Sequence, residues 1–130
     1  MNPHWLDRTL TECAYHYTLV LTEEDFFAEL KRIELPEYRW DIFLGNGSPA
    51  KTYHFQHDGN NLAVVALDAE LAKTKEPIQV AALLVHEAVH IWQRHADAIG
   101  SHNDHGDEEE AYAIQSIAQC LMYEYARQTK

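Results

Sequence analysis

One long segment without helix breakers limits what this chain can fold into more than any other feature. It runs from Ile78 to about Ala98, with Pro77 just before it and Gly100 just after it. Proline is tolerated in the first turn of a helix and glycine commonly ends one, so the segment predicts a single long helix. From Val80 to Trp92 its side chains are apolar on all sides, except at three ionisable positions. A helix of this type is buried on most sides, so the rest of the chain must cover it.

The three ionisable positions form the motif His86-Glu87-Ala88-Val89-His90. Residues i and i+4 of a helix share one face about 6 Å apart, so the two imidazoles can bind one zinc ion. Glu87 is rotated about 100° from His86 and reaches the open side of such an ion, not the ion itself. There it would act as the general base toward a water molecule that the zinc activates.

The alternative is that the two histidines are ordinary core residues. The chain contains nine histidines, and a chance motif of this form has a probability of roughly several per cent in such a composition. The surroundings favour the metal, because burying three polar groups without partners would be costly and a metal ion removes that cost. The sequence therefore predicts one zinc ion per chain at His86 and His90.

A catalytic zinc ion usually has three protein ligands and one open position, so a third ligand is expected further along the chain. The candidates are the glutamates Glu108, Glu109 and Glu110 at the start of the next predicted helix, and the loop histidines His102 and His105. An antiparallel helix after a short loop would return its first turn to the side of His90. Compensation of the helix dipole also explains why acidic residues stand at that position, and it does not compete with metal binding.

With these residues the chain resembles a minimal gluzincin, a HExxH zinc metallopeptidase whose third ligand is a glutamate on a downstream helix. The run from Glu108 to Tyr112 is similar to the family pattern, and it makes Glu108 the ligand, Ala111 the small residue and Tyr112 the supporting polar group. The stretch around both motifs is also similar to small zincin-like proteins of phages and prophages. The resemblance implies a zincin-like fold, peptide hydrolysis, and an oxyanion-stabilising residue for which Tyr112, His54 and His105 are candidates.

Two patterns on the last predicted helix disagree about the third ligand. The apolar stripe through Ile114, Ile117 and Leu121 passes through Glu110, while Glu108 lies about 160° away from it. The gluzincin pattern instead favours Glu108. We therefore assign the third ligand to Glu108, with Glu110 as the alternative.

The remaining elements predict an α+β fold with helices on one side of a small, mostly antiparallel sheet. Thr22 and the acidic residues after it are typical of a helix N-terminus, and Asp58-Gly59 is typical of a hairpin turn. We expect the sheet edge within 62–67 to lie above the zinc and bind extended peptide, as in zincins. The expected helices are 1–20, 23–34, 77–98 and 107–127, and the expected strands are 38–44, 52–55 and 62–67.

Composition narrows the class of protein further. A chain of 130 residues fits one domain spanning 1–130, and a formal net charge of −11 with scattered basic residues argues against nucleic-acid and membrane partners. Cys13 and Cys120 belong to no CxxC pair and are typical of reduced thiols in the cytoplasm.

The sequence thus predicts a cytoplasmic zinc metallopeptidase that acts on a peptide or protein substrate. The alternative is a catalytically silent zinc-binding protein that serves as an interaction module or phage effector. A buried base such as Glu87 has no use in a purely structural zinc site, which favours the enzyme.

Overall fold

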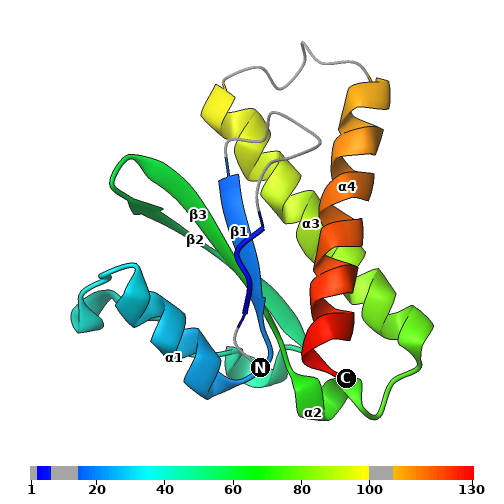
Figure 1. The fold of residues 1–130 in the computed structure, drawn as a ribbon, viewed down its shortest axis with the longest axis horizontal. Helices are drawn as coiled ribbons and strands as arrows, with labels where there is room; N and C mark the ends of the chain where they lie inside the picture. Colours follow the sequence, from blue (N-terminus) through cyan, green and yellow to red (C-terminus); the bar gives the residue numbers. More distant parts are fainter. Residues whose placement is uncertain (1–2, 7–14, 100–106) are drawn as a thin grey trace.

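The computed structural model describes residues 3–6, 15–99 and 107–130 and shows a mixed α+β fold (Figure 1). A three-stranded sheet lies between one helix on one face and a pair of long helices on the other. In chain order the elements are β1 (Tyr15–Val20), α1 (Glu23–Arg32), the 3-10 turns η1 (Glu37–Arg39) and η2 (Gly45–Gly47), β2 (Ala50–His57), β3 (Asn60–Leu67), α2 (Ala69–Ala72), α3 (Pro77–Ile99) and α4 (Asp107–Gln128).

The sheet has the strand order β1-β3-β2. β2 and β3 form the predicted antiparallel hairpin, and its turn holds Asp58 and Gly59 at positive φ. β1 pairs with β3 in parallel, so the expected mostly antiparallel sheet is in fact mixed. The segment 62–67 belongs to the central strand and not to the edge, which corrects a second expectation. The edge strand nearest α3 is β2.

The alternation of side chains along β3 separates two apolar cores. Ala63, Val65 and Leu67 face α3 and α4, whereas Leu62 and Val64 face α1. Successive residues of a strand point to opposite faces, so a buried central strand carries apolar residues on both sides. The expectation that all helices cover one side of the sheet is therefore wrong, because α1 covers the second face (Figure 1).

The helix expected within 1–20 is also wrong where the structure describes this segment. Residues Tyr15–Val20 form β1, in which Tyr17 and Leu19 pack toward the long helices and Val20 packs toward α1. The segment consists of aromatic and β-branched residues apart from His16 and Leu19, a composition that favours a strand over a helix.

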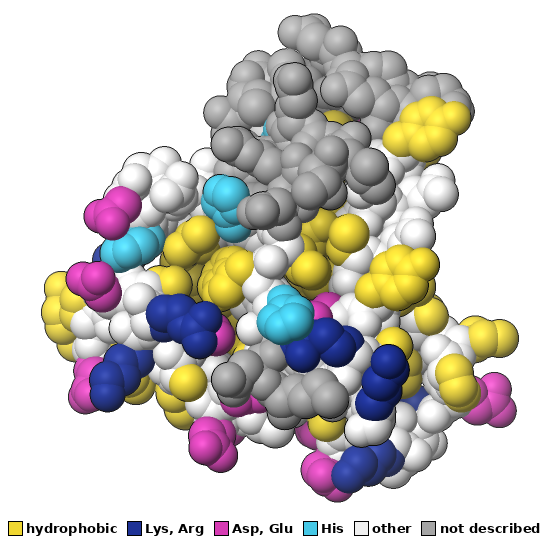
Figure 2. Space-filling model, in the orientation of Figure 1, with side chains coloured by type: hydrophobic (Ala, Val, Ile, Leu, Met, Phe, Trp, Pro, Cys, Tyr) yellow, Lys and Arg dark blue, Asp and Glu magenta, His cyan; other side chains and the backbone are white. Residues whose placement is uncertain are grey.

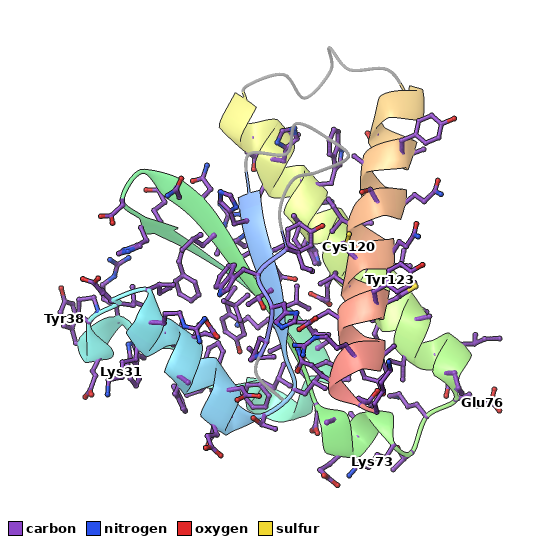
Figure 3. All side chains as sticks on the ribbon, in the orientation of Figure 1. Lys31, Tyr38, Lys73, Glu76, Cys120 and Tyr123 are labelled. Atoms are coloured by element: carbon purple, nitrogen blue, oxygen red, sulfur yellow. The ribbon has the colours of Figure 1, made fainter. Side chains whose placement is uncertain are left out.

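The alternating segment 38–44 does not form a strand. Tyr38 lies in η1, is 87% exposed and points away from the fold beyond the end of α1 (Figure 3). The Tyr53 hydroxyl donates a hydrogen bond to the carbonyl of Ile42 and accepts one from the amide of Leu44, at 2.7 and 3.0 Å. A side chain of β2 thus satisfies backbone groups that a neighbouring strand would otherwise pair.

The helices begin and end close to their predicted positions. The Thr22 hydroxyl caps α1 by accepting a hydrogen bond from the amide of Asp25 at 3.0 Å, and Asp68, expected to be a surface or capping residue, caps the short α2. α3 is less buried than predicted, because His86, Val85 and His90 are exposed. No helix among the described residues is long and apolar enough to cross a membrane.

Charged side chains do not gather into a patch of one sign on the face shown in Figure 2. Acidic and basic groups are interspersed around its lower half, and apolar side chains lie between them. Cys120 on α4 is a free, partly buried thiol (Figure 3), while Cys13 lies outside the described residues.

Candidate metal centre

The predicted motif lies in a cavity between α3 and the edge strand β2. The cavity has a volume of about 400 Å³. Residues of α3 form one wall, including His86, Glu87 and His90, and the start of β2 forms the other. Because α3 crosses the sheet beside an edge strand, its motif faces open space and not a second layer of side chains.

The two motif histidines are positioned as a chelating pair. The distance between His86 Nε2 and His90 Nε2 is 3.2 Å. Two nitrogens bound at about 2.0–2.1 Å to a tetrahedral zinc ion are about 3.3–3.4 Å apart, so this separation fits the ion closely. Both rings are exposed to the cavity, which leaves the space beside the nitrogens accessible.

Gln93 orients one of these rings. Its Oε1 lies 3.0 Å from Nδ1 of His90. An amide oxygen only accepts hydrogen bonds, so Nδ1 carries the ring proton and Nε2 presents its lone pair to the cavity. Metal-ligating histidines in proteins usually donate their second ring N–H to a neighbouring group in this way. Gln93 was not predicted as a site residue, although its i+3 position relative to His90 was a usable signal.

Glu87 is nearly buried and is held from the strand side. Its side chain is 4% exposed, and Oε1 accepts a hydrogen bond of 2.7 Å from the Thr52 hydroxyl of β2. This contact joins the helix to the edge strand at the level of the motif. It leaves Oε2 of Glu87 as the oxygen with capacity to take a proton.

His54 contributes a third imidazole to the cavity wall. Burial, followed by the positive charges of Arg94 and His90, lowers its pKa to about 4. The ring is therefore neutral at pH 7. The sequence identified His54 only as one oxyanion candidate, because the contribution of β2 to the wall depends on strand order.

No protein-family model, curated protein or solved structure matches this chain.

The other predicted site residues lie elsewhere. Glu110 and Tyr112 are exposed on the first turns of α4, Tyr112 by 63%, and neither lines the cavity. The side chain of Glu108 lies outside the described residues, as do His102 and His105. Among the described residues, no three His, Cys, Asp or Glu side chains form a complete metal site. The structure thus brings together His86, His90 and Glu87 and leaves the third ligand a prediction.

The row of buried residues on α4 bears on that prediction. Ile117 and Leu121 are buried, as the apolar stripe predicted, whereas Ile114 is only half-buried and Ala113 is buried beside it. Ala111, which the gluzincin pattern needs as a small residue for close approach, is exposed. Continuing the buried row by one turn leads to Glu109 and Glu110, not to Glu108, although Glu110 itself is exposed.

Proposed function

We propose that the chain is a zinc-dependent metallopeptidase of zincin-like fold that hydrolyses peptide bonds in the cytoplasm. The observation that carries the proposal is the 3.2 Å separation of the His86 and His90 nitrogens beside the buried carboxylate of Glu87. A pair of core histidines would not be exposed to a cavity with their Nε2 atoms close together. Glu108 remains our assignment for the third ligand, with Glu110 as the alternative.

Each side chain of the cavity would have a separate role in hydrolysis. Bound zinc would supply a Lewis acid that polarises the scissile carbonyl and lowers the pKa of water. His86 and His90 would hold the ion, with Gln93 fixing the His90 ring. Glu87 would accept the proton of the attacking water at Oε2 and return it to the leaving amine, while Thr52 holds its other oxygen.

The substrate would lie along β2. As the outer strand of the sheet order, β2 has one side without a neighbouring strand among the described residues. An extended peptide can add to such an edge through main-chain hydrogen bonds, which bind the backbone without requiring a particular sequence. The cavity lies directly between this strand and the motif.

The proposal is tested by comparing Glu87→Gln with the wild type in zinc analysis and in a proteomic cleavage screen. The wild type should hold about one zinc per chain. Glu87→Gln should retain the zinc and the fold while hydrolysis falls about 10²- to 10⁴-fold, the usual contribution of a general base. His86→Ala and His90→Ala should lose most of the zinc, and His57→Ala, which changes a histidine of β2 that does not line the cavity, should not.

Each part of this experiment can fail separately. Full zinc occupancy in a His86→Ala, His90→Ala double variant would place the metal elsewhere. Equal cleavage by Glu87→Gln and the wild type would show that Glu87 is not the base. A zinc-loaded wild type that cleaves nothing in the screen would favour the silent zinc-binding protein.

A further inference from the structure

Arg94 extends the row of motif histidines by one helical turn. His86, His90 and Arg94 follow one another at intervals of four residues, and all three line the cavity. Four residues of helix advance about 6 Å, so Arg94 lies beyond His90 along the cavity, between His90 and Asp97. Its charge acts on His54, which places the guanidinium near the wall that β2 forms.

The guanidinium of Arg94 forms no ion pair with a described carboxylate. Arg32 and Arg127 pair with the buried carboxylates of Glu29 and Glu124. None of the ion pairs of the described residues includes Arg94, which is exposed. Of the described lysines and arginines, Arg94 is the one that both lines the cavity and forms no ion pair with a described acid.

The other charged side chains that line the cavity are not placed to bind an anion in the way that Arg94 is. Lys51 lines the rim, but its ammonium group lies 4.9 Å over the ring of Tyr53 and 4.0 Å from Asp41, on the α1 side of the sheet. Glu87 is held by Thr52. Asp97 also lines the rim and carries a negative charge. It would repel anions from its own side of Arg94, so an anion would bind on the side toward His90.

We propose that Arg94 binds a carboxylate of the peptide and thereby selects acidic substrates. The inference rests on the proposed function, because it takes the ligand of the cavity to be a peptide. A guanidinium binds a carboxylate through two parallel hydrogen bonds, which gives both charge and geometry. The carboxylate can belong to an Asp or Glu side chain or to a free C-terminus.

The geometry also predicts where the carboxylate stands in the peptide. β2 and α3 run in the same direction past the cavity (Figure 1), with Thr52 against Glu87 and with His54 and Arg94 further along each element. An extended chain advances about 3.3 Å per residue, so the 6 Å from His90 to Arg94 corresponds to about two residues. The acidic group should therefore lie within about two residues of the hydrolysed bond.

The test measures binding separately from hydrolysis. Zinc-loaded Glu87→Gln is titrated with fluorescein-labelled heptapeptide pools that contain either Asp and Glu or Asn and Gln, each with a free or an amidated C-terminus. We expect the preferred carboxylate to improve affinity about tenfold, as a charge-assisted hydrogen-bonded pair does. Adding Arg94→Gln should abolish the preference, Arg94→Lys should retain part of it, and Arg39→Gln should leave it unchanged. Arg39 is an exposed arginine in η1 and controls for the change in net charge.

The pools distinguish the two sources of the carboxylate. A preference for Asp and Glu that persists in amidated peptides identifies a side chain, and a loss on amidation identifies the C-terminus. Equal affinity for all pools, or a preference that survives Arg94→Gln, overturns the inference. Cleavage by the wild type without any acidic preference would overturn it and leave hydrolysis standing, whereas selective binding without cleavage would support Arg94 and count against hydrolysis.

Discussion

Hydrogen bonds from neighbouring side chains fix the groups of the cavity before any ligand binds. Gln93 sets the tautomer of His90, and Thr52 holds one oxygen of Glu87. Groups that are oriented in advance lose little freedom when a ligand arrives, which is the usual source of accuracy in a catalytic site. The helix spacing predicted His86, Glu87 and His90, because ligand spacing on a helix is local. Thr52 was not predicted, because its contact with Glu87 joins residues 35 positions apart.

Replacing Thr52 tests this positioning at the scale of one residue. Thr52→Val removes the hydroxyl that donates to Glu87 while keeping the shape of the side chain. We expect the free energy of unfolding to fall by about 1 to 2 kcal/mol, because a nearly buried carboxylate loses a partner. We also expect kcat to fall about tenfold with KM little changed, because the base loses its orientation.

Thr52→Ser is the matched control, since it keeps the hydroxyl and loses only a methyl group. Urea unfolding and steady-state kinetics on both variants give the two measurements. A Thr52→Val enzyme with the kcat of Thr52→Ser would show that the hydrogen bond does not position the base.

At the scale of elements, helices were predicted better than strands. Capping residues and apolar spacing identified α1, α3 and α4 closely, because these signals lie within the helix itself. The segment 38–44 was wrongly predicted as a strand, because its alternating apolar side chains serve contacts other than strand pairing. Trp40 stacks on Phe27 and donates to the carbonyl of Leu35, and Leu44 adopts a left-handed conformation. Strand order and direction could not be predicted, because they depend on pairing between distant segments.

The element that supplies the third ligand is open to a direct experiment. α4 offers Glu108 and Glu110, and β2 offers His54. We expect a zinc titration to show a large loss of affinity for Glu108→Ala, similar to that of His86→Ala. A glutamate that only compensates the helix dipole contributes about 0.3–1 kcal/mol, so its loss should hardly change zinc binding.

The same titration contains the outcomes that would reassign the ligand. Release of zinc by Glu110→Ala alone would show that the buried row of α4 is the better guide. Release by His54→Ala alone would assign the ligand to the edge strand, and the metal would then join the sheet to α3 instead of joining two helices.

At the scale of the whole molecule, residues 3–6 connect elements on opposite faces of the sheet. The amide of His4 donates to Glu124 of α4 at 2.7 Å, and the indole of Trp5 donates to Glu29 of α1 at 3.0 Å. Both carboxylates are nearly buried, with 3% and 1% of their surfaces exposed. Arg127 and Gln128 complete the partners of Glu124.

This arrangement predicts a loss of stability in acid. Burial alone would raise the pKa of Glu124, but the hydrogen bonds from Arg127, His4 and Gln128 outweigh burial and hold it below the ordinary value of 4.5. A depressed pKa in the folded state stabilises the fold above pH 4.5, and that contribution is lost as the pH falls through the folded-state pKa. Urea midpoints measured from pH 6 down to about pH 3 should therefore decrease, as protonation linkage requires.

Glu124→Gln should flatten this dependence, since the amide does not titrate over that range. Glu70→Gln is the control, because Glu70 is exposed and pairs only with Lys73 among the described residues. If Glu124→Gln and the wild type lose stability in parallel as the pH falls, other carboxylates cause the acid sensitivity.

The bond between His4 and Glu124 joins residues 120 positions apart, which has a consequence for the order of events during synthesis. The segment 3–6 leaves the ribosome well before its partner on α4, which is synthesised 120 positions later. Contacts between such distant residues form late, because the intervening chain must first be ordered. We therefore expect residues 3–6 to dock only after α1 and α4 have covered the two faces of the sheet.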